Sequence, residues 1–266
     1  MRILALIKYS MDVAEVKVDP ATKELRLAGV PEKIGAIDKN VAEAAVQLKE
    51  ANGAALQALC LGPLAATDSF KDVLAMGLDE VFLVEDPFAG AADGRVAACI
   101  LEAAIRKLGQ FDLILCGFAS DDGYSYQVAP RLAERLGLPL VSYGRQLKVS
   151  DGQLEAERDL EDGLQAVSVS LPALASIAEE AYPPRRTTLM EAIKAKKKPV
   201  NVWHVEPDLG LVRNELEKLS SIESSSQVGV MIQRKQRMLK TATLRESADQ
   251  LIDLLLEEKV LKGGSK

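Results

Sequence analysis

The sequence contains few cysteines, histidines and aromatic residues, and each shortage excludes a kind of site. Of 266 residues, three are cysteine, one is histidine and 4% are aromatic. Cys60, Cys99 and Cys116 form no C-x-x-C pair, and His204 is the single histidine. We therefore expect neither a Cys/His metal site nor an iron–sulfur cluster held by this chain. Because the cysteines lie in apolar segments, we expect them to be small core residues in a reducing compartment.

Positive charge and long apolar runs are also scarce. The chain has 33 basic and 39 acidic residues, with a net charge of −6. We expect no nucleic-acid partner, because phosphate binding needs a basic surface, and the lysines at 194–198 are only a local exception. No apolar segment reaches membrane-spanning length, and the run at 3–7 is too short for a signal-peptide core. We therefore expect a cytoplasmic protein without membrane insertion.

What the sequence does contain is an alternation of apolar strands and amphipathic helices. Strands are predicted at 2–8, 55–61, 80–84, 111–116 and 140–143, and helices at 38–50, 67–76, 91–108 and 125–136, with Asp38 as the N-cap of the first. This alternation predicts an α/β fold with a doubly wound, mainly parallel, Rossmann-like sheet. After Gly144, the segments 145–149, 153–158 and 165–170 predict a small antiparallel portion. A strand is expected to end at Leu171-Pro172-Ala173.

The C-terminal part is less regular than the rest. We expect an α/β domain over 1–203 and a C-terminal arm over 204–266. The arm should end in a helix that begins near Thr243, where Thr243 and Glu246 match a capping box. The apolar stripe of this helix comprises Leu244, Ala248, Leu251, Ile252 and Leu255. The stripe packs either on its own domain or on a partner subunit, and the sequence does not favour one over the other.

A ligand site is expected at the carboxyl ends of the parallel strands. The ends at 6–8, 61–63 and 116–123 stand out. In the third, Gly117 and Gly123 let the backbone approach a ligand, and the helix start near 125–128 offers free N–H groups for a phosphate. The alternative is an ordinary β–α loop. No G-x-G-x-x-G or P-loop motif is present, which disfavours a conventional Rossmann dehydrogenase and a P-loop NTPase.

Many short segments, in a fixed order, resemble the β subunit of electron transfer flavoproteins (FixA-like). The segments are Ile7-Lys8 with Asp12, Asp38 with 43–50, 61–63, 74–79, 117–127, 132–134, the acidic turn 158–163, 171–173, the helix closing on 194–199, and 208–210. The resemblance spans nearly the whole chain. It implies a heterodimer in which the arm wraps an α subunit that carries an FAD on a mobile domain. It also implies that this chain has no catalytic triad.

The resemblance implies a bound nucleotide as well. Members that only shuttle electrons bury an AMP in the β subunit, whereas bifurcating members hold a second FAD there, which accepts hydride from NADH. Here Val128 replaces the threonine of shuttle members, and Gly35-Ala36 replaces an Asn-Pro. The Gln-Val-x-Pro helix start is more similar to FAD-holding members. We therefore expect FAD, with AMP as the alternative, and with NADH as a donor and an acyl-CoA-type or other dehydrogenase as partner.

The family's binding residues carry over position by position. The adenosine pocket comprises Leu6, Ile7, Lys8, Leu61 and Gly62, and the phosphate loop comprises Gly117, Ser120, Asp121, Asp122, Gly123, Tyr126, Gln127 and Val128. Because Asp121 and Asp122 would repel a phosphate, we expect them to cap backbone or to bind sugar hydroxyls.

The helix at 187–196 resembles the recognition loop that anchors the dehydrogenase. Leu189 matches the protruding leucine of that loop, and a buried core leucine is the alternative reading. A free-standing ATP- or AMP-binding protein of the adenine-nucleotide α-hydrolase kind would share the sheet. The long arm and the lysine-rich segment count against that alternative.

Overall fold

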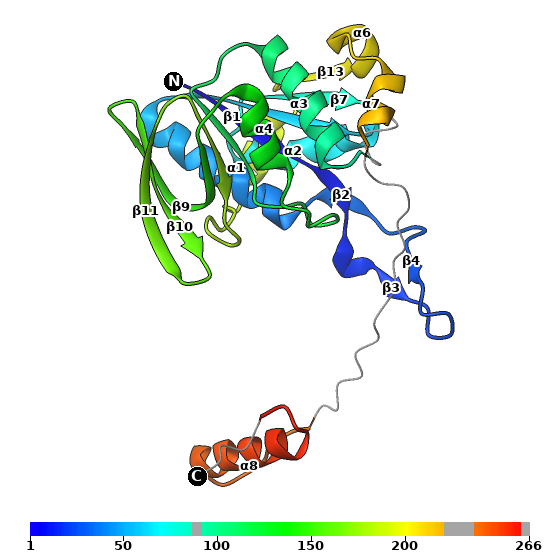
Figure 1. Ribbon diagram of the computed structural model, residues 1–266, viewed down its shortest axis with the longest axis vertical. Helices are drawn as coiled ribbons and strands as arrows, with labels where there is room; N and C mark the ends of the chain where they lie inside the picture. Colours follow the sequence, from blue (N-terminus) through cyan, green and yellow to red (C-terminus); the bar gives the residue numbers. More distant parts are fainter. Residues whose placement is uncertain (87–91, 221–236, 262–266) are drawn as a thin grey trace. The chain divides into compact units, whose positions relative to one another are not determined.

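A computed structural model describes residues 1–86, 92–220 and 237–261 of the chain (Figure 1). It divides the chain into two compact units. The first comprises residues 1–17 and 25–227, and the second comprises residues 18–24 and 228–266.

The strands and helices of the described residues have the following bounds. The strands are β1 (Arg2–Ile7), β2 (Tyr9–Met11), β3 (Lys17–Val18), β4 (Leu25–Arg26), β5 (Glu32–Ile34), β6 (Ala55–Gly62), β7 (Glu80–Glu85), β8 (Leu113–Gly117), β9 (Leu140–Ser150), β10 (Gln153–Leu160), β11 (Gly163–Ser170), β12 (Ala173–Ile177) and β13 (Val200–His204). The helices are α1 (Ala36–Asn52), α2 (Phe70–Met76), α3 (Gly94–Leu108), α4 (Val128–Leu136), α5 (Leu189–Ala195), α6 (Val205–Leu209), α7 (Arg213–Leu219) and α8 (Leu244–Glu257), with 3-10 turns η1 (Val13–Glu15) and η2 (Leu64–Ser69).

The first unit is built on one nine-stranded sheet with the order β11-β10-β9-β12-β8-β1-β6-β7-β13. The strands from β9 to β13 in this order are parallel, and β10 and β11 add an antiparallel edge. The predicted fold class, a doubly wound and mainly parallel α/β sheet with a small antiparallel portion, is confirmed. The order reverses at β1, because the chain runs from β1 to β6 and β7 on one side and then returns to β8 on the other.

Helices cover both faces of the sheet, and each face has its own apolar core. Because successive strand residues point to opposite faces, a strand covered on both sides must be apolar throughout. In β1, Ile3 and Ile7 contribute to the core beneath α1 and α2, whereas Leu4 and Leu6 contribute to the core beneath α3 and α4. The continuous apolar run at the N-terminus is therefore the signature of a central strand.

Two strands of the sheet, β12 and β13, were not predicted. All five residues of β12 are buried, and it lies between β8 and β9. Its sequence, Ala-Leu-Ala-Ser-Ile, is poor in the β-branched and aromatic residues that identify strands, because small side chains fill this crowded position. The expected strand end at Leu171-Pro172-Ala173 is therefore wrong, since β11 ends at Ser170 and β12 begins at Ala173. The segments predicted separately at 140–143 and 145–149 form the single strand β9.

The C-terminal part of the chain is shared between the two units. Helices α6 and α7 bury Val205 and Leu216 in a core of the first unit. In the second unit, α8 has the predicted capping box of Thr243 and Glu246, and none of its residues is buried. Residues 221–236 and 262–266 of the predicted arm, and the first residue of the helix predicted at 91–108, lie outside the described residues. No helix in the described parts of the chain is long and apolar enough to cross a membrane.

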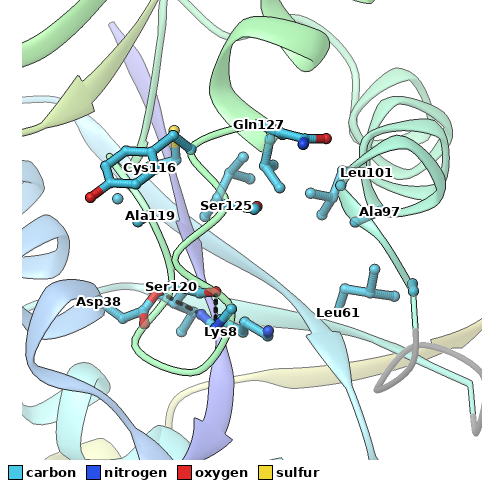
Figure 2. A pocket seen from close by; sticks show the side chains of 18 of the residues that line it. Lys8, Asp38, Leu61, Ala97, Leu101, Cys116, Ala119, Ser120, Ser125 and Gln127 are labelled. Atoms are coloured by element: carbon cyan, nitrogen blue, oxygen red, sulfur yellow. Dashed lines mark hydrogen bonds between the residues drawn. The ribbon is translucent and has the colours of Figure 1, made fainter. Parts of the chain in front are cut away.

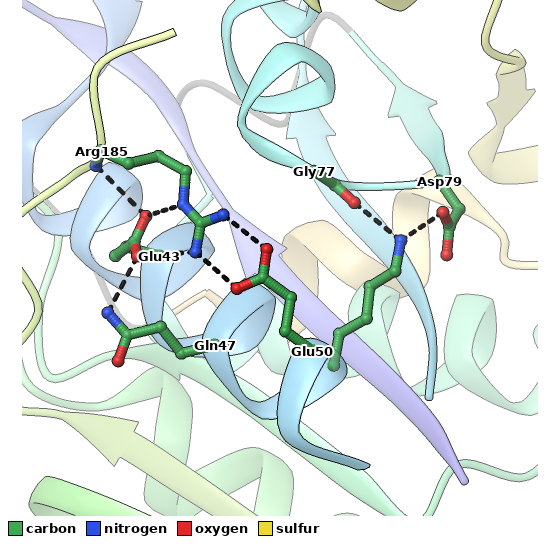
Figure 3. A network of polar contacts seen from close by, with 7 residues as sticks. Glu43, Gln47, Glu50, Gly77, Asp79 and Arg185 are labelled. Atoms are coloured by element: carbon green, nitrogen blue, oxygen red, sulfur yellow. Dashed lines mark hydrogen bonds and ion pairs between the residues drawn. The ribbon is translucent and has the colours of Figure 1, made fainter. Parts of the chain in front are cut away.

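The segment between β12 and α5 is held against α1 by hydrogen bonds and ion pairs, some of which Figure 3 shows. The Asn40 side chain donates to the Ala178 carbonyl at 2.8 Å and accepts from the Tyr182 amide at 2.5 Å. The Glu43 side chain, which is 4% exposed, accepts from Nε of Arg185 at 2.8 Å and from its Nη2 at 3.0 Å. Arg185 also donates to Glu50 at 2.6 Å. Burial alone would raise the pKa of Glu43, but the hydrogen bonds from Arg185 and Gln47 outweigh burial and lower it.

Replacing Arg185 should therefore destabilise the fold. The substitution Arg185→Ala leaves the Glu43 carboxylate buried without its cation, which should lower the free energy of unfolding by about 3 kcal/mol. Arg186→Ala is the matched control, because Arg186 is the exposed neighbour, and it should change stability by less than about 0.5 kcal/mol. Urea denaturation measures both, and equal effects of the two substitutions would contradict the role given to Arg185.

Candidate functional site

A cavity of about 360 Å³ lies at the carboxyl ends of β1, β6 and β8, where the strand order reverses (Figure 2). Most of the predicted cofactor-binding residues line it: Leu6, Ile7, Lys8, Leu61, Gly117, Ser120, Gly123, Tyr126, Gln127 and Val128. Gly62, Asp121 and Asp122 do not line it. The structure adds Asp38 from α1, together with residues at the start of α3, such as Ala97 and Leu101.

The loop after β8, residues 117–127, is shaped by its own packing. A side chain at Gly117 would place Cβ 2.5 Å from the Ile37 side chain and 2.6 Å from the Ala119 carbonyl oxygen, so only glycine fits. Tyr124 and Tyr126 have φ values of 44° and 59°, in the left-handed region that bulky residues rarely adopt. The Phe118 ring lies 5.6 Å from each of these two tyrosine rings and packs against them. The loop therefore has a defined shape along the cavity wall.

The start of α4 lines this cavity and has no side-chain cap. The helix begins at Val128, three residues later than predicted, and its N-cap residue Gln127 makes no side-chain capping hydrogen bond. At α3, by contrast, the Asp93 side chain accepts from the amides of Arg95 and Val96. An uncapped helix start carries unpaired N–H groups and a partial positive charge. The start of α4 is therefore suited to an anionic oxygen supplied by a ligand.

The two acidic residues of the loop contact the protein itself. The Ala36 amide donates to the Asp121 carboxylate, so of the two expected roles Asp121 has the backbone-capping one, at α1. Gly35 is required beside it, because a Cβ there would lie 1.6 Å from Oδ2 of Asp121. Burial raises the pKa of Asp121, and the charge of Asp122 adds to this. Asp122 accepts from Nζ of Lys8 at 2.7 Å, and this contact outweighs burial and lowers the pKa of Asp122.

Asp38 is the site residue that the sequence placed wrongly. It is not the N-cap of α1, which is Gly35, but lies in the first turn with its side chain buried. Its Oδ1 accepts from the backbone amide of Lys8 at 2.8 Å. Burial raises the pKa of Asp38 to about 8, partly opposed by the Lys8 amide and assisted by the charge of Asp121. The capping rule assigned Asp38 to the helix N-terminus, because no local pattern indicates its contact with the Lys8 amide.

Two of the three cysteines are confirmed as buried core residues. Cys60 and Cys116 are buried free thiols, and burial raises the pKa of each to about 12. Cys99 is half-buried against the core beneath α3. Among the described residues there is no cluster of three or more potential metal ligands.

The cavity combines a polar end with an apolar wall. Figure 2 shows Lys8, Asp38 and Ser120 together at one end and Leu61, Ala97 and Leu101 across from them. A helix start at α4 without a side-chain cap and an apolar wall suit a ligand that has both a phosphate and an aromatic ring system.

The predicted docking residue lies on a separate helix. Leu189 begins α5, which has a capping box formed by Thr188 and Glu191. The Leu189 side chain is 78% exposed, so it is not a core leucine. Met190 and Ile193, on the same short helix, are also exposed.

Gly117 and Gly62, two of the three glycines predicted to bind the cofactor, should respond differently to substitution. Gly117→Ala introduces the two contacts described above, which should lower the free energy of unfolding by about 1–3 kcal/mol. Gly62→Ala is the matched control, because its Cβ would meet only ordinary contacts at 3.8 and 3.9 Å, and its effect should stay within about 0.5 kcal/mol. Urea denaturation of both variants measures the difference. A Gly117→Ala protein as stable as Gly62→Ala would show that the loop is not constrained as described.

Comparison with known proteins finds relatives over most of the chain. The family model described as "Electron transfer flavoprotein domain" matches residues 25–208. The chain is 33% identical over 262 residues to an electron transfer flavoprotein subunit beta of Thermoanaerobacterium thermosaccharolyticum, covering 98% of this chain and 100% of the relative. It is 35% identical over 212 residues to CarD, a subunit of the caffeyl-CoA reductase-Etf complex of Acetobacterium woodii, covering 79% of this chain and 80% of CarD.

A third relative extends over the same length. The chain is 31% identical over 276 residues to the acryloyl-CoA reductase electron transfer subunit gamma of Anaerotignum propionicum, covering 98% of this chain and 100% of that subunit. The resemblance drawn from the ordered segments is confirmed, and the chain belongs to the electron transfer flavoprotein β-subunit family.

Proposed function

We propose that this chain is the β subunit of a heterodimeric electron transfer flavoprotein and that it binds FAD in the cavity at the carboxyl ends of β1, β6 and β8. The observation that carries the proposal is the start of α4, which lines that cavity without a side-chain cap and lies there together with apolar side chains. An adenine nucleotide has the matching parts, a phosphate and an aromatic base.

The residues divide into two groups around such a ligand. The ends of β1 and β6, at Leu6, Ile7 and Leu61, would contact the adenosine, and the backbone from Gly117 to Val128 would hold the diphosphate. Asp121, Asp122 and Gly62 would act indirectly, by holding α1, Lys8 and the strand end in place. Tyr124 and Tyr126 are 46% and 40% exposed beside the loop, and they offer aromatic surface to the part of a dinucleotide outside the cavity.

FAD bound there would supply the redox chemistry, since it can take a hydride from NADH, leaving NAD⁺, and release the two electrons one at a time. One electron would pass through the FAD of the α subunit to a high-potential acceptor, and the other to a low-potential carrier. The name of CarD, a subunit of a caffeyl-CoA reductase-Etf complex, and the acryloyl-CoA reductase subunit support an acyl-CoA-type partner. We further propose that the C-terminal arm, with the exposed stripe of α8, packs on the α subunit.

A structural AMP is the second candidate. The cavity volume of about 360 Å³ favours it, because this is near the lower end of the range for ligand pockets and suits a mononucleotide. Val128 in place of a threonine favours FAD, because it removes one hydroxyl donor that a terminal phosphate would use. Membership of the flavoprotein family counts against the third alternative, a free-standing ATP- or AMP-binding protein.

The nucleotide content of the purified heterodimer tests the proposal. The chain should be co-expressed with an α subunit from the same organism, and the bound nucleotides released by acid and separated by chromatography. We expect about two FAD molecules per heterodimer, one in each subunit. One FAD and one AMP per heterodimer would show that the β subunit holds AMP and not FAD. The absence of any adenine nucleotide from the β subunit would contradict both candidates.

We also propose that Leu189 anchors the dehydrogenase partner. An exposed apolar side chain beside other exposed apolar residues is typical of an interface anchor. Leu189 is 78% exposed, Met190 is 62% exposed and Ile193 is 45% exposed, and all three lie on α5. The contacts of Asn40 and Glu43 hold the segment before α5 against α1, so this surface is presented rigidly.

A charge at Leu189 should weaken docking without unfolding the protein. We expect Leu189→Glu to raise the KM for an acyl-CoA-type dehydrogenase about tenfold or more, with an unchanged melting temperature. Leu164→Glu is the matched control. Leu164 is also an exposed leucine, at 59%, but it lies on β11 and not on α5. Steady-state electron transfer between heterodimer and dehydrogenase measures the effect, and equal KM values for both variants would refute the assignment.

A further inference from the structure

Asp38 lines the cavity, and one oxygen of its carboxyl group makes no hydrogen bond in the described structure. The residue is 4% exposed and lines the cavity. Its Oδ1 accepts from the Lys8 amide at 2.8 Å, which fixes the orientation of the carboxyl group. Its Oδ2 is buried and makes no hydrogen bond. A buried polar atom without a hydrogen-bond partner destabilises the folded protein. Its presence in a residue that lines a cavity therefore indicates a ligand that forms the missing hydrogen bond.

The charges around Asp38 do not favour a carboxylate. From β1, the ammonium of Lys8 is directed to Asp122 at 2.7 Å rather than to Asp38. From the loop after β8, Asp121 and Asp122 both add negative charge. The thiols of Cys60 on β6 and Cys116 on β8 are neutral, because burial raises the pKa of each to about 12. Burial raises the pKa of Asp38 most, and the charges of Asp121 and Asp122 add to this, whereas the Lys8 amide and the Lys8 charge lower it.

We propose that Asp38 holds a proton on Oδ2 and donates it to an acceptor atom of the adenosine moiety, a ring nitrogen or a sugar oxygen, so that nucleotide binding is lost in alkaline solution. This inference rests on the proposed function, because it states which group donates and which accepts in one hydrogen bond of that site. A carboxyl group kept neutral in an apolar environment is a strong donor, whereas its ionised form offers only acceptors. The contact would therefore select ligands with an unprotonated acceptor at this position.

The sign of the pH dependence follows from the direction of the shift. The pKa of Asp38 is raised to about 8, mainly by burial, whereas an ordinary aspartate has a pKa of about 3.9. The protonated, ligand-binding form is therefore present at neutral pH and is lost as the pH rises through about 8. Above that pH the group has no proton to donate, and its charge repels an anionic ligand.

A pH series of binding measurements tests this inference. The heterodimer with its α subunit should be freed of nucleotide and titrated calorimetrically with AMP from about pH 7 to about pH 10. The Kd of the wild-type protein should rise about tenfold per pH unit above about pH 8.

The matched variant is Asp38→Asn, whose amide oxygen can accept from Lys8 while its NH₂ group donates permanently to the ligand. Its Kd should stay within about twofold of the wild-type value at pH 7 and be nearly constant across the series. Asp38→Leu, which lacks a donor, should bind about tenfold more weakly at pH 7. Melting temperatures of all three proteins show whether each is folded, and the wild-type and Asn proteins suffice if the Leu variant does not fold.

The outcomes separate this inference from the proposed function. A wild-type Kd that does not change with pH, or an Asn variant with the same pH profile as the wild type, would overturn the role of Asp38 and leave the nucleotide site standing. A folded heterodimer that binds neither AMP nor FAD at pH 7 would overturn the proposed function itself.

Discussion

The parallel pairing of β1 with β6 on one side and with β8 on the other is the constraint on which the rest of the structure depends. Leu6 pairs with Leu59 of β6, and Ala5 pairs with Leu115 of β8, so the three strands end at the same edge of the sheet. Because the chain order reverses here, the connections from β1 and β8 diverge and leave a cavity between them. The apolar residues of β1 thus both fill the cores and create the site.

Helix α1 connects this cavity to the surface that we propose for docking. Its first turn carries Asp38, held by the Lys8 amide, and the next turns carry Asn40 and Glu43, which bind the segment leading to α5. A single helix therefore lines the cavity at one end and, along its length, holds the segment that leads to the proposed anchor. The close contact of Gly35 with Asp121 fixes the same helix from the loop after β8.

Local sequence patterns predicted the elements whose burial is visible in their own residue types. The apolar runs of β1, β6, β7 and β8 were found because a strand covered on both faces leaves such a run. β12 was missed because its small residues reflect crowding by its neighbours, which no local pattern encodes. Asp38 was misplaced for a related reason: its partner, the Lys8 amide, lies 30 positions earlier in the chain. The glycines of the loop after β8 were recognised. The packing of Tyr124 and Tyr126, which shapes the loop, depends on their left-handed backbone conformation, and that conformation could not be predicted from the sequence.

We propose that the loop from Gly117 to Gln127 and the start of α4 surround the phosphates of a tightly held adenine nucleotide. An experimental structure of the assembled heterodimer, purified without added nucleotide, tests it most directly. We expect density for an adenine nucleotide in the cavity, with phosphate oxygens near the amides of the first turn of α4 and the adenosine near the ends of β1 and β6. An empty cavity, or one filled by the protein's own side chains in the complete complex, would contradict it.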